Sequence, residues 1–254
     1  MRYQGGKSRV AEDIAARIGG GISEMTYQGG KSRIANDLSQ IMTGGDTFVS
    51  LFCGGCAVEE RVTGFSRMIL NDSHPYLIAM YRGLQNGYEL PETMTREEYA
   101  YIREHKDEDP VLTGFVGFGC SFGGKWFGGF ARNTRKDCYV EQSRNSLSKT
   151  MKALKDAEFL CGDYRLVPIP PCSTIYADPP YKGTTGYNRR EFRTDYFWDY
   201  MRILARNGHH VYISEMEAPE DFRCVWQKEF RRTLNKNQPM VVTEKLFTYG
   251  GQTA

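Results

Sequence analysis

Residues 47–56 read TFVSLFCGGC, an apolar run that ends in a turn of cysteine and glycine. The run predicts a buried strand that ends near Phe52, and the glycines predict a tight turn directly after it. A helix is expected to begin near Ala57, and residues 68–71 predict a second strand that ends at Asp72. Such a β-turn-α-β unit is typical of an open, mostly parallel α/β sheet.

Further strands and helices alternate along the chain, as this fold class requires. Apolar residues at helical spacing predict helices, and short apolar runs predict strands. Helices are expected at residues 77–84, 143–157 and 197–206, strands at 158–161, 173–177 and 210–214, and a closing hairpin around 239–249. The pattern therefore predicts a Rossmann-like α/β fold.

The composition suits one enzyme-sized unit. The chain has 254 residues, of which 40% are hydrophobic, and its formal net charge is +2. It contains no run of about 18 apolar residues, and its seven cysteines are an odd, scattered set. We expect a soluble, cytoplasmic protein with reduced cysteines that does not enter a membrane.

Residues 88–145 interrupt the alternation and are interpreted as an insertion. An acidic helix is expected at residues 96–106, and residues 114–136 read GFVGFGCSFGGKWFGGFARNTRK. Rings among glycines and basic side chains are typical of a nucleic-acid interface, although the same rings can pack as a small core. The candidate DNA contacts are Lys125, Trp126, Arg132, Arg135 and Lys136, with Arg189 and Arg190 in a later loop that can equally be ordinary surface.

The sequence YQGGKSR occurs twice, at residues 3–9 and 27–33. A phosphate-binding loop of the type GxxxxGK[ST] would need a glycine where Met1 and Met25 stand. Neither copy follows a predicted strand either, so a nucleotide triphosphatase is disfavoured. Alone, each copy would be interpreted as a glycine turn before a helix.

Residues 175–181 read IYADPPY and give the strongest indication of a catalytic site. The strand brings Asp178 to its carboxyl end, where open α/β sheets bind ligands, and two prolines stiffen the turn before Tyr181. The Asp178 carboxylate and the Pro179 carbonyl can accept both hydrogens of an amino group, while the Tyr181 ring stacks on a planar substrate. The alternative is a proline-rich loop without a catalytic role.

Cys53 and Cys56 form a CxxC pair, which raises the possibility of redox chemistry or a zinc site. No second CxxC pair and no nearby pair of histidines completes a metal site in the sequence. Small cysteines buried in a tight turn are the simpler interpretation, and we expect no metal.

Four features in order resemble the motifs of the alpha-group, Dam-like N6-adenine DNA methyltransferases, especially the phage-type members. They are YQGGK at 27–31, FCGGC at 52–56, Asp72, and DPPY at 178–181, with the insertion before the last. The resemblance spans the chain from about residue 25. It implies a Rossmann-like class I methyltransferase fold with a target-recognition insertion. It also implies transfer of a methyl group from S-adenosylmethionine to N6 of adenine in double-stranded DNA.

The resemblance implies roles for individual residues. Tyr27 and Lys31 would contact the methionine part of the cofactor, and Asp72 would hold its ribose. Cys56 stands where the family has the second glycine of FxGxG, a departure that bears on cofactor affinity. The implied cofactor-binding residues are Tyr27, Gly29, Gly30, Lys31, Phe52, Cys53, Gly54, Asp72 and Asp178, and the implied catalytic residues are Asp178, Pro179, Pro180 and Tyr181.

The resemblance also suggests how the chain is divided. Lys31 lies 21 residues before Phe52 and Lys7 lies 45 before it, and the shorter separation looks like the family's. The second copy of YQGGKSR is therefore taken as the working motif. Residues 1–24 are expected to be a duplicated extension, 25–87 and 146–254 the catalytic domain, and 88–145 the recognition insertion. A monomer is favoured, in a bacterium or a phage-infected host cell, with restriction-modification as a possible setting.

Two other functions stay open at this point, and a third is disfavoured. N4-cytosine methylation needs the same loop chemistry, although Asp178 before the prolines favours adenine. A DNA-binding protein that has lost catalysis would explain the departure at Cys56. Cytosine-C5 methylation would need Cys172 as nucleophile, but this residue precedes its strand and should lie at the opposite edge of the sheet.

Overall fold

The structure is a computed structural model that describes Tyr27 and residues 30–42, 45–131, 139–180, 192–235 and 238–251. For residues 231–235 and 238–240 it describes the backbone only. Several predicted features lie outside the described residues. They are the first YQGGKSR copy, Gly29, Arg132, Arg135, Lys136, Tyr181, Arg189 and Arg190.

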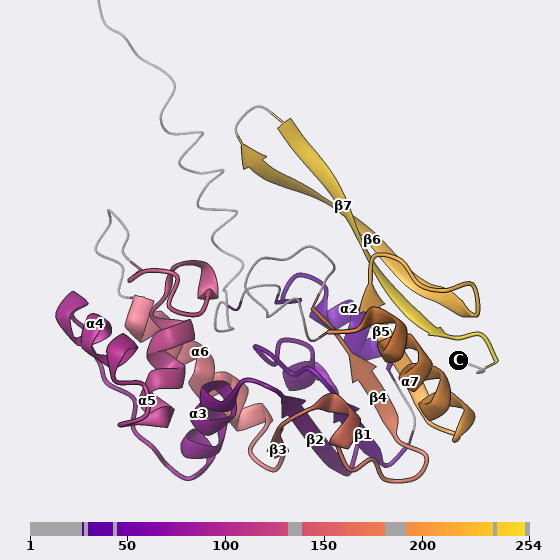
Figure 1. Cartoon of the computed structure of the whole chain (residues 1–254), viewed down its shortest axis with the longest axis horizontal. Coiled ribbons are helices and arrows are strands. Elements are labelled where there is room, and N and C mark those ends of the chain that lie inside the picture. Colours follow the sequence, from indigo (N-terminus) through magenta and orange to yellow (C-terminus); the bar gives the residue numbers. More distant parts are fainter. Residues whose placement is uncertain are drawn as a thin grey trace, which may run out of the picture.

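The core of the molecule is a seven-stranded mixed sheet (Figure 1). Its strands are β1 (Thr47–Ser50), β2 (Arg67–Asp72), β3 (Glu158–Cys161), β4 (Thr174–Ala177), β5 (His210–Glu215), β6 (Phe222–Asn235) and β7 (Gln238–Tyr249). They stand in the order β3-β2-β1-β4-β5-β7-β6. Strands β1 to β5 run parallel, whereas β7 is antiparallel to both of its neighbours. The predicted Rossmann-like α/β fold is confirmed.

Alternate residues of the parallel strands face two different cores, because side chains along a strand point in turn to opposite faces. Phe48, Leu70 and Tyr176 are buried in one core, and their neighbours Val49 and Ile69 lie in the other. The first core also holds the apolar sides of α2 (Ala35–Ile41), α3 (Pro75–Gln85) and α6 (Tyr139–Ala153), and the second that of α7 (Thr194–Arg206). Helices therefore cover both faces of the sheet.

The expected helices follow local signals in the sequence. α3 begins with Pro75 at a position where the missing N–H costs nothing. α4 (Arg96–Glu104) begins with a capping box, in which Thr95 Oγ1 accepts from the Glu98 N–H at 3.1 Å and Glu98 Oε2 accepts from the Thr95 N–H at 2.7 Å. The acidic helix expected at residues 96–106 is therefore confirmed, two residues shorter.

Two expectations for the sheet region need correction. The helix expected from Ala57 is only a short 3-10 turn, η1 (Glu59–Arg61). Val62 directly after this turn is extended, and Arg67 already pairs with Thr47, so few residues are left for a longer helix. The closing hairpin is present, but its first strand, β6, extends over 14 residues that the apolar pattern did not reveal.

The insertion forms a helical cluster beside α3, on the left of Figure 1. It contains α4, α5 (Pro110–Gly114), the π-helix η2 (Phe115–Gly119) and the 3-10 turn η3 (Phe122–Gly124). α5 packs closely on α3, since a Cβ at Gly114 would lie 2.1 Å from the Tyr76 carbonyl oxygen. The insertion is thus anchored on the helix that follows β2.

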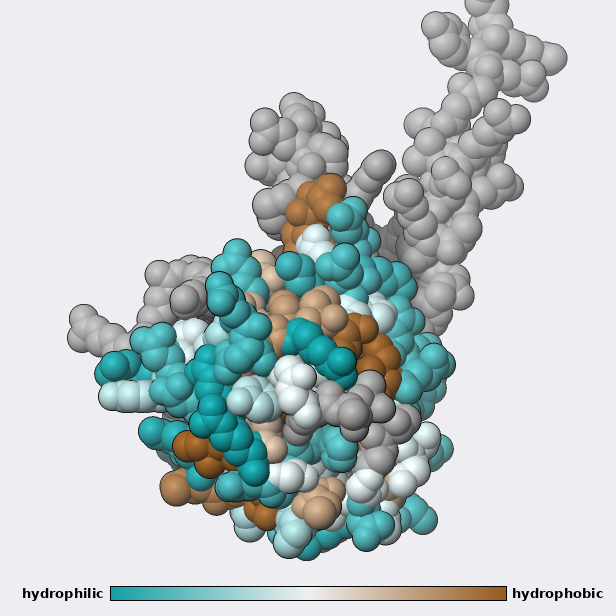
Figure 2. All heavy atoms as spheres, turned by 90° about the vertical axis from the view of Figure 1, so that its right-hand side faces the viewer, coloured by the Kyte–Doolittle hydropathy of each residue, from teal (hydrophilic) through white to brown (hydrophobic). Residues whose placement is uncertain are grey.

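The β6–β7 hairpin extends well beyond the sheet (Figure 1). The side of the molecule that lies on the right in Figure 1 is mostly hydrophilic, with hydrophobic residues in separate patches (Figure 2). Among the described residues, no helix combines the length and the apolar character needed to cross a membrane. The described cysteines are free thiols: Cys53, Cys56, Cys120, Cys161, Cys172 and Cys224.

Candidate active site

The carboxyl end of β4 meets two elements that are far away in sequence. Asp178 directly follows β4, and its Oδ1 atom lies 3.3 Å from Nζ of Lys31. The same ammonium donates to Oε2 of Glu244 on β7 at 2.9 Å. Lys31 is only 6% exposed and Glu244 8%, so the three charges meet in a desolvated place. Lys31 therefore links the YQGGK and DPPY motifs directly.

The charges at this edge change one another's protonation. Burial and the charge of Glu244 raise the pKa of Asp178, and Lys31 lowers it. Together they place this pKa at about 6. Burial alone would lower the pKa of Lys31, but the carboxylates of Asp178 and Glu244 raise it above its ordinary value. Near neutral pH Asp178 is consequently ionised and accepts hydrogen bonds only.

The glycine turn after β1 packs against the other end of the YQGGK motif. Gly54 has a positive φ of 47°, and a Cβ there would lie 3.0 Å from Cε1 of Tyr27. Only glycine combines this backbone conformation with so close an approach of the tyrosine ring. The turn is also fixed by Cys53, whose N–H donates to the Asn71 carbonyl at 2.8 Å. Tyr27, Cys53, Gly54 and Lys31 thus lie in one region.

Asp72 lies at the end of β2, beside the glycine turn. Its two carboxylate oxygens accept the backbone N–H groups of Gly54 at 3.0 Å and His74 at 2.9 Å. Burial raises the pKa of Asp72, and the bonds from His74 and Gly54 lower it. The carboxylate therefore holds the turn after β1 to the end of β2.

Phe52 contributes to an aromatic wall at the same edge of the sheet. Its ring centroid lies 5.1 Å from that of Tyr164 and 6.1 Å from those of Phe192 and Phe197. The sequence analysis did not single out Tyr164, which follows β3 closely. Its position shortly after a predicted strand could have indicated that Tyr164 lies at this edge of the sheet.

Glu59 is a second buried acid that the sequence analysis missed. It is 2% exposed, and its Oε1 accepts from the Ser50 hydroxyl at 2.6 Å. Burial raises the pKa of Glu59, and the Ser50 hydrogen bond lowers it, with a result of about 8. The charge of Asp178 also raises this pKa. Glu59 is therefore largely protonated at neutral pH.

The remaining members of the DPPY loop are only partly described. Pro179 is buried and Pro180 is half-buried. The Tyr176 hydroxyl and Ser214 Oγ are 3.1 Å apart, which ties β4 to β5 just before the loop. The loop thus leaves from a firmly held strand.

The three cysteines that the sequence raised as candidates, Cys53, Cys56 and Cys172, occupy positions unsuited to nucleophilic chemistry at this edge. Cys172 precedes β4 and is exposed at the amino end of the strand, opposite to Asp178. Cys53 and Cys56 are buried, and burial raises the pKa of both thiols. A thiolate is the reactive form of cysteine, so these environments favour the packing interpretation.

The rings of the insertion divide into packed and exposed side chains. Trp126 is half-buried, stacks on Tyr76 at 5.5 Å and lies 4.3 Å from the His74 ring. Phe118 is 4% exposed and Phe122 70%. Of the predicted DNA contacts, Lys125 is exposed and described, and Trp126 is largely engaged in this aromatic cluster. The expectation that some of these rings simply pack agrees with the structure.

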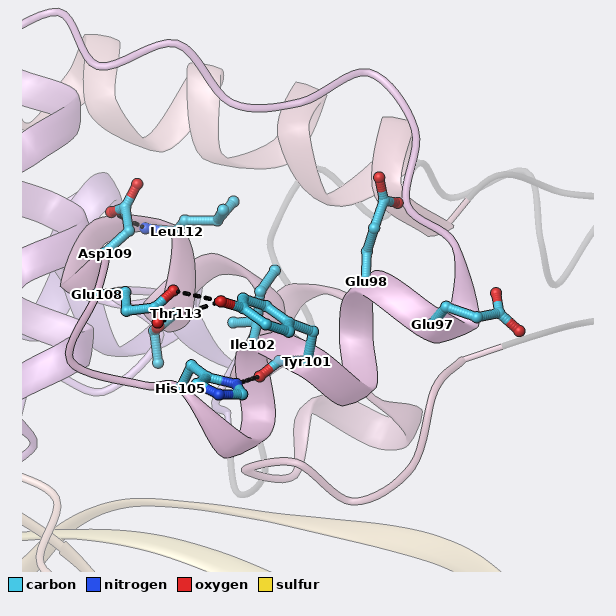
Figure 3. Close-up of a pocket in the computed structure, with 9 residues that line it drawn as sticks. All are labelled: Glu97, Glu98, Tyr101, Ile102, His105, Glu108, Asp109, Leu112 and Thr113. Carbon is cyan, nitrogen blue, oxygen red and sulfur yellow. Dashed lines mark hydrogen bonds between the residues drawn. The ribbon is translucent and has the colours of Figure 1, made fainter.

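A pocket of about 550 Å³ lies between α4 and α5 rather than at the sheet edge (Figure 3). The Tyr101 hydroxyl inside it donates to Glu108 at 3.0 Å, and the His105 ring lies against the Tyr101 carbonyl. None of the predicted site residues lines it. The acidic side chains around it are Glu97, Glu98, Glu108 and Asp109. This lining repels phosphate and does not suit a DNA backbone.

Comparisons with known proteins agree with the motifs. Residues 27–111, about a third of the chain, match the D12 class N6 adenine-specific DNA methyltransferase family. No curated protein sequence matches the chain.

Two solved structures are similar to this chain at low identity. A conserved hypothetical protein of Streptococcus pyogenes shows 11% identity and a TM-score of 0.40, with 89% of this chain and 98% of that chain covered. The rRNA methyltransferase AviRa of Streptomyces viridochromogenes shows 9% identity and a TM-score of 0.38, with 86% of this chain and 83% of that chain covered.

Proposed function

We propose that this chain is a D12 class N6 adenine-specific DNA methyltransferase dependent on S-adenosylmethionine, and that the carboxyl edge of its sheet is the catalytic site. The observation that carries the proposal is the Lys31–Asp178 contact of 3.3 Å, which joins YQGGK to DPPY. Tyr27 packed on Gly54 joins YQGGK to the turn after β1 in the same way.

The residues present fit the cofactor. S-Adenosylmethionine supplies an electrophilic methyl group on a cationic sulfonium and also carries an ammonium. The carboxylates of Asp72 and Asp178, which end or follow parallel strands at this edge, form a surrounding that favours a cation. We assign cofactor binding to this edge, with Tyr27, Gly29, Gly30, Lys31, Phe52, Cys53, Gly54, Asp72 and Asp178 as its residues.

The chain's own contribution to transfer is to bind and orient the target amine. Asp178, ionised near neutral pH, accepts one amino hydrogen, and the Pro179 carbonyl accepts the other. These bonds draw the nitrogen lone pair out of ring conjugation and direct it at the methyl group. Pro180 stiffens the loop, and Tyr181 stacks on the base.

The target base has to leave the duplex, because Asp178 cannot reach an adenine within a double helix. Flipping costs a few kcal/mol, which contacts with double-stranded DNA have to offset. We assign these contacts to Lys125 and Trp126 and to the basic residues beyond the described ranges, Arg132, Arg135, Lys136, Arg189 and Arg190.

The proposed division of the chain follows the same reasoning. Residues 25–87 and 146–254 form the catalytic domain, and 88–145 the recognition insertion. The second YQGGKSR copy is the working one, a choice that the contact of its lysine with Asp178 supports. We further infer a cytoplasmic monomer from a phage or a bacterial restriction-modification system, on the basis of the resemblance to phage-type members.

Transfer of labelled methyl from S-adenosylmethionine to unmethylated duplex DNA, followed by nucleoside identification, tests the function. Label in N6-methyladenine is expected. Label in N4-methylcytosine would keep the mechanism but overturn the target base. Absence of both label and calorimetric cofactor binding would favour a DNA-binding protein without catalysis.

A further inference from the structure

Glu244 occupies a strand position where an apolar residue would continue the pattern. Val242 and Leu246, its neighbours on the same side of β7, are 8% and 0% exposed, and Glu244 itself is 8% exposed. A carboxylate at such a position costs free energy unless it is paired and hydrogen-bonded. Packing alone therefore does not explain an acid here.

The partner of Glu244 is the lysine that also contacts the predicted catalytic acid. Lys31 Nζ lies 2.9 Å from Glu244 Oε2 and 3.3 Å from Asp178 Oδ1. An ammonium presents its three hydrogens in fixed directions, so the bond to Glu244 limits how it can approach Asp178. The shorter distance shows that Glu244 holds the ammonium more closely than Asp178 does.

We propose that Glu244 is a positioning residue for methyl transfer, which holds Lys31 and thereby keeps the Asp178 carboxylate oriented and available to the target amino group. This inference rests on the proposed function. β7 lies beside β5, which pairs with β4, so the strand order fixes the distance between Glu244 and Asp178. The antiparallel strand would thus contribute directly to the geometry of the DPPY loop.

The electrostatics of the cluster gives the proposal a measurable consequence. Among the described residues, the titratable groups that bear on Asp178 are Lys31, Glu244, Glu59 and Tyr176. Burial and Glu244 raise the pKa of Asp178, and Lys31 lowers it. Without the Glu244 charge, Lys31 would pair with Asp178 alone and occupy its acceptor oxygen. The pKa of Asp178 would fall, and the carboxylate would be a poorer acceptor for the amine.

The experiment compares kcat, KM and their pH dependence for the wild type and Glu244→Gln. Activity needs ionised Asp178, so it is lost as pH falls through the pKa of this group. For Glu244→Gln we expect kcat about tenfold lower, KM for DNA changed less than about twofold, and the acidic limb moved down by about one pH unit. Glu244→Asp keeps the charge and is expected to restore the acidic limb and part of kcat. An unmoved acidic limb in Glu244→Gln, or equal losses in both variants, would overturn the proposal.

Glu229→Gln is the matched control, because it removes the same charge from an exposed position on the partner strand β6. Its pH profile should match the wild type, and a shift equal to that of Glu244→Gln would contradict the specific role of Glu244.

Two measurements remain decisive if the variant folds poorly or the wild type transfers no methyl. NMR titration of the Asp178 carboxyl, assigned with Asp178→Asn, should give a lower pKa in Glu244→Gln, and an unchanged pKa would overturn the proposal. Lys31→Met/Glu244→Gln removes both charges and should lose less thermal stability than the sum of the single variants. Additive losses would contradict the holding of Lys31 by Glu244. Absence of methyl transfer by the wild type would count against the proposed function alone.

Discussion

The carboxyl edge of the sheet and the helical insertion use polar and aromatic side chains in different ways. At the edge, Lys31, Asp178 and Glu244 come from three distant parts of the sequence and pair in a buried place. In the insertion, rings from neighbouring residues pack on one another and on α3, as Trp126 does on Tyr76. The acids of the insertion surround an open pocket instead (Figure 3).

The difference shows that the buried charges at the edge depend on the sheet to bring them together, whereas the rings of the insertion do not. Charges buried at the edge need exact partners, because an unpaired buried charge is strongly destabilising. Rings in the insertion need only good packing, which is local. Substitutions should therefore separate the two regions by size of effect and by pH dependence.

Lys31→Met should have the largest effect on stability. It leaves the Asp178 and Glu244 carboxylates buried without their ammonium, which costs about 3–5 kcal/mol. The Asp178 carboxylate then binds a proton more readily, because Lys31 no longer lowers its pKa, so the loss should be smaller at pH 5 than at pH 8. Arg67→Met is the control, since it breaks the exposed Arg67–Glu158 pair and should cost less than about 1 kcal/mol. Equal losses of unfolding free energy in Lys31→Met and Arg67→Met, measured by chemical denaturation, would contradict the difference between buried and exposed ion pairs.

Glu59→Gln should alter stability in the opposite direction, and only at higher pH. The folded-state pKa of about 8 lies above the ordinary value of 4.5, so the folded protein binds this proton more tightly than the unfolded chain. The stability that Glu59 contributes at low pH is therefore lost as pH rises from 4.5 to about 8. Glutamine keeps an acceptor for the Ser50 hydroxyl. Across this pH window the free energy of unfolding of the variant should therefore rise relative to that of the wild type, by up to a few kcal/mol. A stability difference between the variant and the wild type that does not change with pH would contradict the raised pKa of Glu59.

Gly117→Ala should act on the insertion alone. A Cβ at Gly117 would lie 2.1 Å from Cζ3 of Trp126, so the aromatic cluster must shift at a cost of about 1–3 kcal/mol. Gly162→Ala is the control, because a Cβ there meets nothing within 4 Å. Tryptophan fluorescence and DNA affinity should change in Gly117→Ala, while cofactor binding measured by calorimetry stays at the wild-type level. Loss of cofactor binding in this variant would contradict the separation of the two regions.

Most of the sheet could be predicted because its strands are short apolar runs that end at informative residues. Residues 47–52, 68–71 and 173–177 all correspond to observed strands, and Asp178 stands where the sequence places it. β6 was missed because most of the side chains described for it are exposed or half-buried, so its sequence has no continuous apolar run. The helix expected at Ala57 was wrong because the chain becomes extended at Val62 and enters β2 at Arg67, which local spacing does not reveal.

The candidate site could be predicted only in part. Lys31 and Asp178 lie in recognisable motifs, whereas their proximity depends on the folded sheet. Glu244 had a signal, since alternation with Val242 and Leu246 places it on a buried side. Its contact with Lys31, however, depends on the position of β7 between β5 and β6 in the sheet, which the strand pattern alone does not reveal. Glu59 had no signal, because the short turn that buries it was expected to be a helix.

Methyl transfer by Asp178→Ala tests the central claim most directly. Labelled transfer to adenine should fall below a few per cent of the wild-type rate, because the amine loses its acceptor. The fold should remain, since Lys31 keeps its bond to Glu244. Asp156→Ala, which removes an exposed carboxylate before β3, should retain wild-type transfer. Transfer by Asp178→Ala at a substantial fraction of the wild-type rate, in a folded protein, would contradict the assignment of catalysis to this edge of the sheet.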